Sequence, residues 1–238
     1  MTRIPIPRSR IVLIAVLYLL ARPATAAAQE WVTQADSLGF CGLALDTTEL
    51  KDYARQVAFL NLQPGDTLVD IGASSGWFEG AAGCLSPVKD HHFVLVDIDT
   101  ACTNERTVAR MTSYYSGLHG APLSYTYSVV HNTPRSLGLP PGFARKFLLR
   151  ETLHEIRDRD RFVAALAAAC RADGQVIVIE QVPTKKRERH SGCNDLLLET
   201  SDIVSLFRKG GFHLVQKELL RFPGVTLQML RFAHWQGR

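Results

Sequence analysis

The segment TLVDIGASSGWFEG, residues 67–80, decides the fold class of this chain. An apolar run leads into Asp70, a loop with Gly72 and Gly76 follows, and a helix-like segment continues from the loop. A glycine-rich turn between a strand and a helix lets the backbone approach a ligand closely, with helix N–H groups directed at it. The segment therefore predicts a ligand-binding loop after the first strand of an α/β sheet.

The rest of the chain alternates predicted strands with predicted helices. Strands are expected at residues 67–71, 92–99, 125–130, 145–150 and 175–181, and helices at 47–62, 75–84, 100–118, 157–174 and 201–209. Such alternation predicts a doubly wound, mostly parallel sheet. Two final strands, 213–219 and 225–232, have no helix between them and are expected to be antiparallel, which gives a seven-stranded sheet with an antiparallel final strand.

The acidic residues near this loop indicate the charge of the ligand. Asp70 stands two positions before the first glycine, where a carboxylate would repel the pyrophosphate of a dinucleotide. The second strand ends in Asp97-Ile98-Asp99, at the position where a carboxylate accepts hydrogen bonds from ribose hydroxyls. Either acid of this pair could face the ribose while the other caps the next helix. Together these acids favour a nucleoside that carries positive charge.

From about residue 47 to the end, the sequence resembles the class I S-adenosylmethionine-dependent methyltransferases, which have a Rossmann-like fold. The family motif acid-x-Gly-x-Gly-x-Gly matches Asp70, Gly72 and Gly76, with Ser74 in place of the middle glycine. The segments FLLRETLHEIRD and ACRADGQVIVIE and the terminal hairpin resemble further family features. The resemblance implies S-adenosyl-L-methionine as the cofactor, with Asp97 at its ribose.

Other positions near the implied cofactor depart from the family pattern. Ser74 should narrow the glycine loop, and Ala144 stands where many relatives have an acid at the start of strand four. The resemblance places Ile98 in the nucleoside pocket. After strand three, Asn132 stands where relatives often have an acid that contacts adenine, and its amide could pair with the adenine amino group.

Methyl transfer from a sulfonium requires alignment and desolvation, and a general base helps when the acceptor is a hydroxyl or an acidic carbon. Glu151, Thr152 and His154 follow the fourth strand, at the edge of the sheet where ligands bind. His154 is the first candidate for the base and Glu151 the second. The alternative for His154 is a structural imidazole, because this histidine is common in the family without a catalytic role.

Residues 1–28 have the pattern of a secretory signal peptide. Three arginines lie within the first ten residues, an apolar run covers residues 11–20, and alanines at 26–28 offer a cleavage site. The run is short for a membrane span, so an uncleaved anchor is the weaker alternative. The first 28 residues hold four of the 27 basic residues and no acid, so the remainder has 23 of each sign. The sequence thus predicts an exported protein, periplasmic or secreted, without a basic surface for nucleic acid.

The expected organisation is a signal peptide over residues 1–28, an N-terminal cover segment and helix over 29–62, and a cofactor-binding domain over 63–238, with 29–46 over the cofactor. A small-molecule substrate is expected, with no stable membrane span after cleavage and the oligomeric state left open. Because S-adenosylmethionine is made in the cytoplasm, an inactive, exported binding protein with this fold is an alternative. A nicotinamide-dependent oxidoreductase is disfavoured by the loop spacing and the closing hairpin.

An exported chain with five cysteines permits disulfides, and an odd count leaves at least one thiol free. In the layout of the resembled family, Cys41, Cys102 and Cys193 belong to the ligand-binding edge of the sheet. At most one disulfide is therefore expected, from Cys41 to Cys102 or Cys193. His190 and Cys193 could provide two metal ligands, but the sequence shows no second pair and no metal site is predicted.

Overall fold

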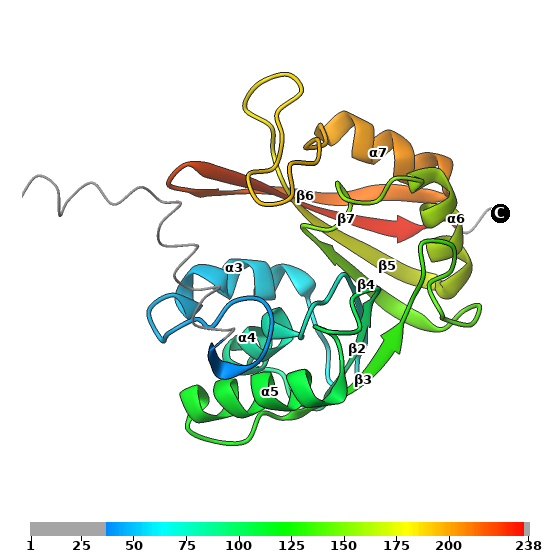
Figure 1. Cartoon of the computed structure of the whole chain (residues 1–238). Coiled ribbons are helices and arrows are strands. Elements are labelled where there is room, and N and C mark those ends of the chain that lie inside the picture. Colours follow the sequence, from blue (N-terminus) through cyan, green and yellow to red (C-terminus); the bar gives the residue numbers. More distant parts are fainter. Residues whose placement is uncertain (1–36, 236–238) are drawn as a thin grey trace, which may run out of the picture.

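The computed structural model describes residues 37–235, in which the predicted strands assemble into one seven-stranded sheet (Figure 1). The strands are β1 (Thr67–Ile71), β2 (His91–Asp97), β3 (Tyr125–His131), β4 (Ala144–Arg150), β5 (Cys170–Gln181), β6 (Phe212–Phe222) and β7 (Val225–His234). Their order across the sheet is β3-β2-β1-β4-β5-β7-β6.

The first five strands are parallel to their neighbours, and β7 lies between β5 and β6, antiparallel to both. The predicted mostly parallel, seven-stranded sheet with an antiparallel final strand is therefore confirmed. Successive strands leave β1 first toward β2 and β3, and the chain then returns to place β4 on the other side of β1. The sheet thus changes direction between β1 and β4, and in open α/β sheets ligands bind at the carboxyl ends of strands next to such a point.

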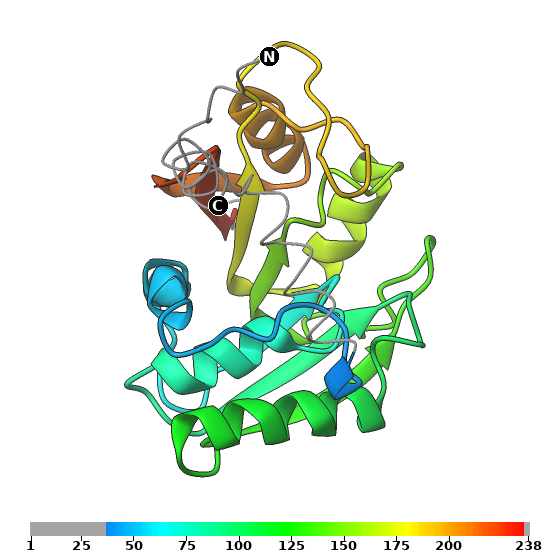
Figure 2. The same ribbon diagram turned by 60° about the vertical axis from the view of Figure 1, so that its left-hand side comes forward.

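Helices cover both faces of the sheet, because the central strands have apolar side chains on both sides. The helices are α3 (Leu50–Leu60), α4 (Trp77–Leu85), α5 (Glu105–His119), α6 (Arg159–Ala169) and α7 (Thr200–Lys209). The first three lie on one face and α6 and α7 on the other (Figures 1 and 2). Neighbouring residues alternate accordingly: Leu68 packs in the core with α3–α5, and Val69 in the core with α6 and α7.

Two element boundaries differ from the sequence prediction. The alanine-rich helix was expected over residues 157–174, but α6 ends at Ala169 and Cys170 already pairs with Ala144 of β4. Two further backbone N–H groups, those of Gly142 and Phe143, donate to the last carbonyls of α6, so the chain turns there in spite of its helix-forming residues. The helix expected from residue 100 begins only at Glu105, where Asn104 and Thr107 form a capping box.

The described part of the predicted cover segment, residues 37–46, lies against α4 and α5. Phe40 and Leu45 are buried in the core, and two tyrosines of α5 form hydrogen bonds with the backbone of this segment. The Tyr115 hydroxyl donates to the carbonyl of Leu43 over 2.9 Å, and the Tyr114 hydroxyl donates to that of Leu45 over 3.1 Å. The segment reaches the glycine loop at Cys41, whose carbonyl accepts from the hydroxyl of Ser75.

A disulfide joins this segment to the loop after β2. Cys41 and Cys102 are bonded, with their Cα atoms 5.4 Å apart, while Cys84, Cys170 and Cys193 are free. The prediction of one disulfide from Cys41 is confirmed, and Cys102 is the partner.

Several predictions concern residues that the structure does not describe. The signal peptide over residues 1–28 lies outside residues 37–235, as does the start of the cover segment. Within 37–235, no helix is both long enough and apolar enough to cross a membrane. The division of the chain at residue 63 stays a prediction; α3, before it, packs in the same core as the sheet.

Candidate functional site

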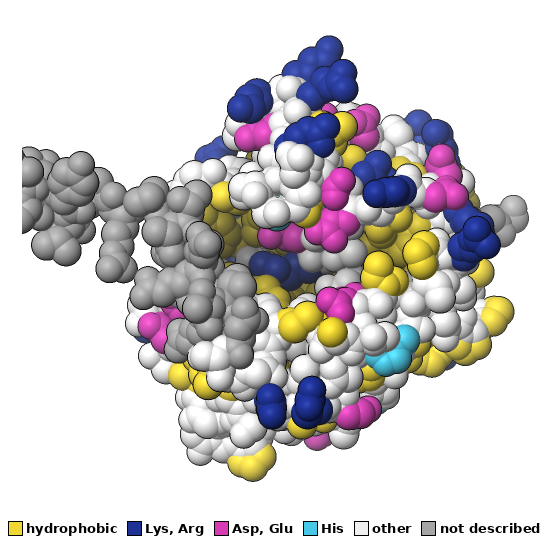
Figure 3. Space-filling model, viewed as in Figure 1, with side chains coloured by type: hydrophobic (Ala, Val, Ile, Leu, Met, Phe, Trp, Pro, Cys, Tyr) yellow, Lys and Arg dark blue, Asp and Glu magenta, His cyan; other side chains and the backbone are white. Residues whose placement is uncertain are grey.

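A cavity of about 800 Å³ opens at the carboxyl ends of β1, β2 and β4. Six of the nine residues predicted for the site line it: Gly72, Ser74, Asp97, Ile98, Asn132 and Glu151. Its volume lies within the range of small-molecule and cofactor sites. Figure 3 shows the hollow on this face of the molecule, with acidic and basic side chains around it. Three predicted residues, Asp70, Gly76 and His154, do not line this cavity.

The loop after β1 requires glycine for steric reasons. Gly72 has a φ of +80°, and a Cβ at this position would stand 2.3 Å from the Oγ1 of Thr152. Gly76 has a φ of +77° and its Cβ would meet Leu95 at 2.8 Å, so its role is to let α4 start close to β2. Ser74, in place of the family's middle glycine, has a φ of +54°, a conformation that non-glycine residues rarely adopt. Because Gly72 and Ser74 also line the cavity, these conformations bring the loop backbone to the cavity surface.

Asp97 and Asp99, between which the sequence did not decide, have different tasks. One carboxylate oxygen of Asp97 accepts from the backbone N–H of Ser74 over 2.8 Å, and the other from that of Asp99 over 2.9 Å. Asp99 instead accepts from the N–H groups of Ala101 and Cys102, and so caps the turn that leads to the disulfide. Each Asp97 oxygen keeps a further lone pair for a ligand hydroxyl. Asp97 is therefore the acid that connects the glycine loop with the cavity.

Two other lining residues, Asn132 and Ile98, have a polar atom without a partner and an exposed apolar side chain that a ligand would cover. The Oδ1 of Asn132 is buried, and it has no hydrogen-bond partner among the described residues. Ile98 leaves 60% of its surface exposed at the cavity, although it is apolar. A flat ring system with an amino group would cover Ile98 with its apolar face and donate a hydrogen bond to the Oδ1 of Asn132.

The charge of the cavity lining favours a cation. Five acids contribute to it, Asp97, Asp99, Glu151, Glu155 and Asp158, against three arginines, Arg135, Arg157 and Arg161. Of these acids, Glu151 has a φ of +52°, and its N–H donates to the carbonyl of Ile179 over 2.7 Å. Such backbone conformations cost energy and gather at functional sites. Glu151 is thus fixed at the end of β4 with its side chain in the cavity lining.

His154 has a different environment from Glu151. Its side chain is fully buried, and its Nδ1 lies 2.7 Å from the Oε2 of Glu180, whose side chain is also fully buried. The other oxygen of Glu180 accepts from the N–H groups of Leu153 and His154. Arg159 donates to the carbonyls of the same two residues. The ring is therefore held rigidly, and the catalytic role predicted for it stays a prediction.

Comparison with known proteins identifies the fold. The sequence matches no protein-family model and no curated protein. An S-adenosylmethionine-dependent methyltransferase from Methanosarcina mazei superposes on 74% of this chain and 95% of its own, with a TM-score of 0.58 and 12% identity. One from Aquifex aeolicus covers 84% of this chain and 97% of its own, with a TM-score of 0.57 and 12% identity. This chain has the Rossmann-like methyltransferase fold.

The same comparison includes a protein with another activity. The [4+2]-cyclase SpnF superposes on 80% of this chain and 82% of its own, with a TM-score of 0.61 and 13% identity. At such identities the likeness concerns the methyltransferase fold alone.

A buried pair of carboxyl groups, Asp70 and Glu79, lies beneath the glycine loop of this methyltransferase fold. Of these two residues, only Asp70 was predicted from the sequence to belong to the site. Asp70 is 4% exposed and Glu79, in the first turn of α4, is 1% exposed. One carboxyl oxygen of Asp70 and both carboxyl oxygens of Glu79 accept no hydrogen bond from the described residues. A hydrogen bond between the two carboxyl groups therefore requires that one of them carries a proton. Burial raises the pKa of Glu79 to about 7. Burial, then the charge and hydrogen bond of Glu79, raise the pKa of Asp70 well above its usual value.

Arg150, at the end of β4, is the cation nearest to this pair. Its guanidinium lies 4.6 Å from the ring centre of Trp77 and 5.1 Å from that of Phe78, and its charge lowers both carboxyl pKa values in part. The Nε of Arg150 donates to Gln56 over 3.1 Å. Trp77 and Phe78 are buried here. The only sequence signal for Glu79 was an acid in the first turn of an otherwise apolar helix.

The raised pKa of Glu79 predicts a pH-dependent stability. In the unfolded chain Glu79 ionises near 4.5, whereas in the folded protein it keeps its proton to about pH 7. The folded state therefore binds more protons between these values, and stability falls as the pH rises through this window. The shift corresponds to about 3 kcal/mol. We expect Glu79→Gln to raise the free energy of unfolding at pH 8 by about 2–3 kcal/mol more than at pH 5.

Urea unfolding of both proteins at the two pH values measures this difference. Glu105→Gln, at the first turn of α5, is a matched control that should change stability equally at both. An identical pH dependence in wild type and Glu79→Gln would show that Glu79 is ionised in the folded protein at pH 5.

Proposed function

We propose that this chain binds S-adenosylmethionine in the cavity at the carboxyl ends of β1, β2 and β4, and transfers its methyl group to a small-molecule acceptor. The observation that carries the proposal is the arrangement around Asp97, which holds the N–H of Ser74 in the glycine loop and keeps lone pairs for ribose hydroxyls. The resemblance of Asp70, Gly72, Gly76 and Asp97 to the family motifs supports the same cofactor.

The remaining lining residues suit the other parts of this cofactor. Adenine would cover Ile98, and its amino group would donate to the unpartnered Oδ1 of Asn132. The excess of acids over arginines stabilises the sulfonium and ammonium charges. About 800 Å³ exceeds what a nucleoside needs and leaves space for a small acceptor.

Glu151 is the base that we propose for an acceptor that must lose a proton. Its side chain lines the cavity, while the ring of His154 is fully buried and bonded to Glu180. Proton removal as the methyl group arrives lowers the barrier when the acceptor is a hydroxyl or an acidic carbon. Alignment of the methyl group with the acceptor and desolvation of the bound reactants provide the rest of the catalysis.

We also propose that the protein works outside the cytoplasm. The signal-peptide pattern of residues 1–28 and the Cys41–Cys102 disulfide both support export, because disulfides persist in oxidising compartments. Mass spectrometry of the protein from its native host should find a chain that begins near Ala27 or Gln29. A full-length chain in the cytoplasm would contradict export.

An exported binding protein without turnover is the second candidate. The cyclase SpnF is similar to this chain in fold, so this fold does not by itself select methyl transfer. The two candidates differ in the product: only a methyltransferase converts S-adenosylmethionine to S-adenosylhomocysteine when an acceptor is present.

Thermal unfolding of the mature protein with added ligands tests the cofactor class. A ligand at 100 times its Kd stabilises the folded state by about 2.7 kcal/mol, which for a domain of this size raises Tm by roughly 5–10 °C. We expect such a shift with S-adenosylmethionine and S-adenosylhomocysteine, and none with NAD at the same concentration. A shift with NAD alone would favour the oxidoreductase.

A further inference from the structure

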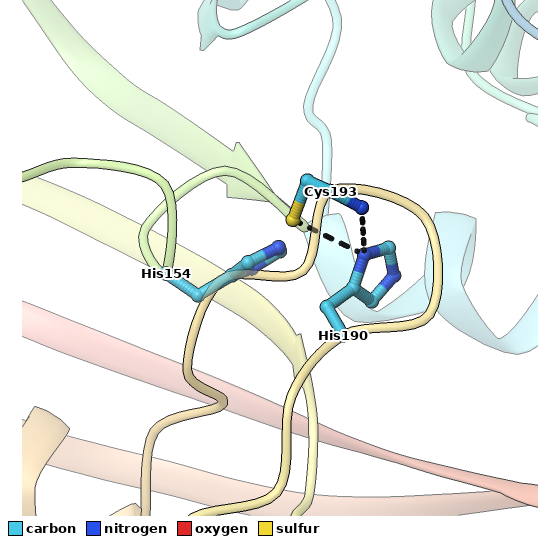
Figure 4. A group of neighbouring side chains, drawn as sticks. All are labelled: His154, His190 and Cys193. Carbon is cyan, nitrogen blue, oxygen red and sulfur yellow. Dashed lines mark hydrogen bonds between the residues drawn. The ribbon is translucent and has the colours of Figure 1, made fainter.

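Three side chains of the kinds that bind transition metals meet beside the cavity (Figure 4). His154 lies in the loop after β4, and His190 and Cys193 lie in the loop between β5 and α7. One candidate ligand atom from each lies within 4.8 Å of the others. No further partner of His190 and Cys193 could be predicted, because His154 is 36 or more positions away in the sequence and is brought there only by the fold.

His154 is oriented as a metal ligand would be. The Glu180 carboxylate accepts from Nδ1, so in the neutral imidazole Nδ1 carries the proton and Nε2 has the lone pair that a metal would use. Nε2 is buried without a hydrogen-bond partner among the described residues, and the nearest carboxylate oxygen, on Glu155, is 4.0 Å away. A buried acceptor without a partner is unfavourable. In metalloproteins, a carboxylate bonded to the other ring nitrogen is the usual support of a histidine ligand.

His190 and Cys193 have matching geometry. The backbone N–H of Cys193 donates to Nδ1 of His190 over 3.4 Å, so this nitrogen is an acceptor, and its single lone pair would exchange this long hydrogen bond for a metal ion. The Cys193 Sγ lies 3.4 Å from the same nitrogen. In a tetrahedral zinc site with Zn–N of about 2.0–2.1 Å and Zn–S of about 2.3 Å, ligand atoms are roughly 3.3–3.6 Å apart. The pair therefore already has the separation of two zinc ligands.

The loop that carries this pair is anchored at both ends. The N–H of His190 donates to the carbonyl of Asp195 over 2.8 Å, and the N–H of Leu197 donates to that of Glu188 over 2.9 Å. The ring centres of His154 and His190 lie 4.8 Å apart. The candidate ligand atoms lie within 4.8 Å of one another, so the exposed part of this loop must close by about 1 Å before all three reach zinc distances.

We propose that His154, His190 and Cys193 bind one Zn²⁺-class ion. Two imidazole nitrogens and a thiolate select such cations over Mg²⁺ and Ca²⁺, which prefer oxygen. The carboxylates of Glu180 and Glu155 offset the cationic charge. Glu155 also lines the cavity, so the cluster lies next to it. The site is separate from the cofactor contacts and does not depend on methyl transfer.

Cobalt(II) is the probe that tests this site, because a bond between Co²⁺ and a thiolate gives a near-ultraviolet charge-transfer absorption. The mature protein, with its disulfide intact, is freed of metal and titrated with Co²⁺ in the absence of S-adenosylmethionine. We expect one equivalent to bind with this absorption, and Zn²⁺ to displace it. No absorption in the wild type would overturn the proposal and leave the proposed function untouched.

Variants assign the ligands. Cys193→Ser should abolish the absorption, and Glu180→Gln should weaken Co²⁺ binding by about 10–100-fold, as loss of such a support does elsewhere. His190→Ala removes a ligand itself and should weaken binding by more. Cys193 is exposed and His190 lies in the same surface loop, so both variants are expected to fold. Absorption that survives in Cys193→Ser would refute the site.

Matched controls are available elsewhere in the chain. Cys84→Ser removes another free thiol and His119→Ala another histidine, at the end of α5. Both should bind Co²⁺ as the wild type does. Loss of the absorption in Cys84→Ser would assign the metal to a different thiol and contradict the proposal.

Discussion

Removal of the Cys41–Cys102 disulfide is expected to lower the free energy of unfolding by about 4 kcal/mol. The bond joins residues 61 positions apart and so limits the unfolded chain, which loses this restriction in the double variant Cys41→Ser/Cys102→Ser. Urea unfolding under non-reducing conditions measures the change. A loss of this size is a large part of the stability of an ordinary domain.

Cys193→Ser is the matched control for this prediction, because it removes an exposed free thiol and should leave stability within about 0.5 kcal/mol of the wild type in metal-free buffer. Thiol counting of the denatured, unreduced wild type should give three free thiols, Cys84, Cys170 and Cys193. Five free thiols, or a double variant as stable as the wild type, would contradict the disulfide.

Asp97→Ala is expected to weaken S-adenosylmethionine binding by about 1.5–3 kcal/mol, which is roughly 10–150-fold. The variant loses charge-assisted hydrogen bonds to the ribose. It also releases the N–H groups of Ser74 and Asp99, and with them the position of the glycine loop. Calorimetric titration of wild type and variant measures the difference.

Asp99→Ala separates the two acids between which the sequence did not decide. Asp99 caps the turn at Ala101 and Cys102, so its loss should reduce stability by about 1 kcal/mol and affinity much less than the loss of Asp97 does. Equal affinities in wild type and Asp97→Ala, with a large loss in Asp99→Ala, would reverse the assignment.

The strands and their order along the chain could be predicted from the sequence, because a strand that is buried on both faces is a continuous run of apolar residues. Val176–Ile179 of β5 is fully buried and reads as one apolar run, which predicts a central parallel strand. The end of α6 at Ala169 left no such signal. Its alanines and the following Cys-Arg-Ala favour helix, and pairing with Ala144 of β4, a contact between distant positions, stops it.

The same distinction between local and long-range signals applies to the candidate site. Gly72, Ser74 and Asp97 could be placed because the strand–loop–helix unit fixes them locally. Glu79, Glu180 and the approach of His190 to His154 could not, because each depends on packing between segments far apart in the sequence. His154 was assigned to the site from its distance along the chain after β4, and the structure turns its ring away from the cavity lining toward Glu180.

Calorimetric titration of the mature protein with S-adenosylmethionine is the direct test of the proposed cofactor. We expect one binding site per chain, with a Kd below 1 mM, and similar binding of S-adenosylhomocysteine; a Kd of 1 mM corresponds to about 4.1 kcal/mol of binding free energy. NAD, titrated in parallel, should give no heat of binding. Absence of binding by S-adenosylmethionine at millimolar concentration, in a protein shown to be folded with its Cys41–Cys102 disulfide intact, would contradict the account.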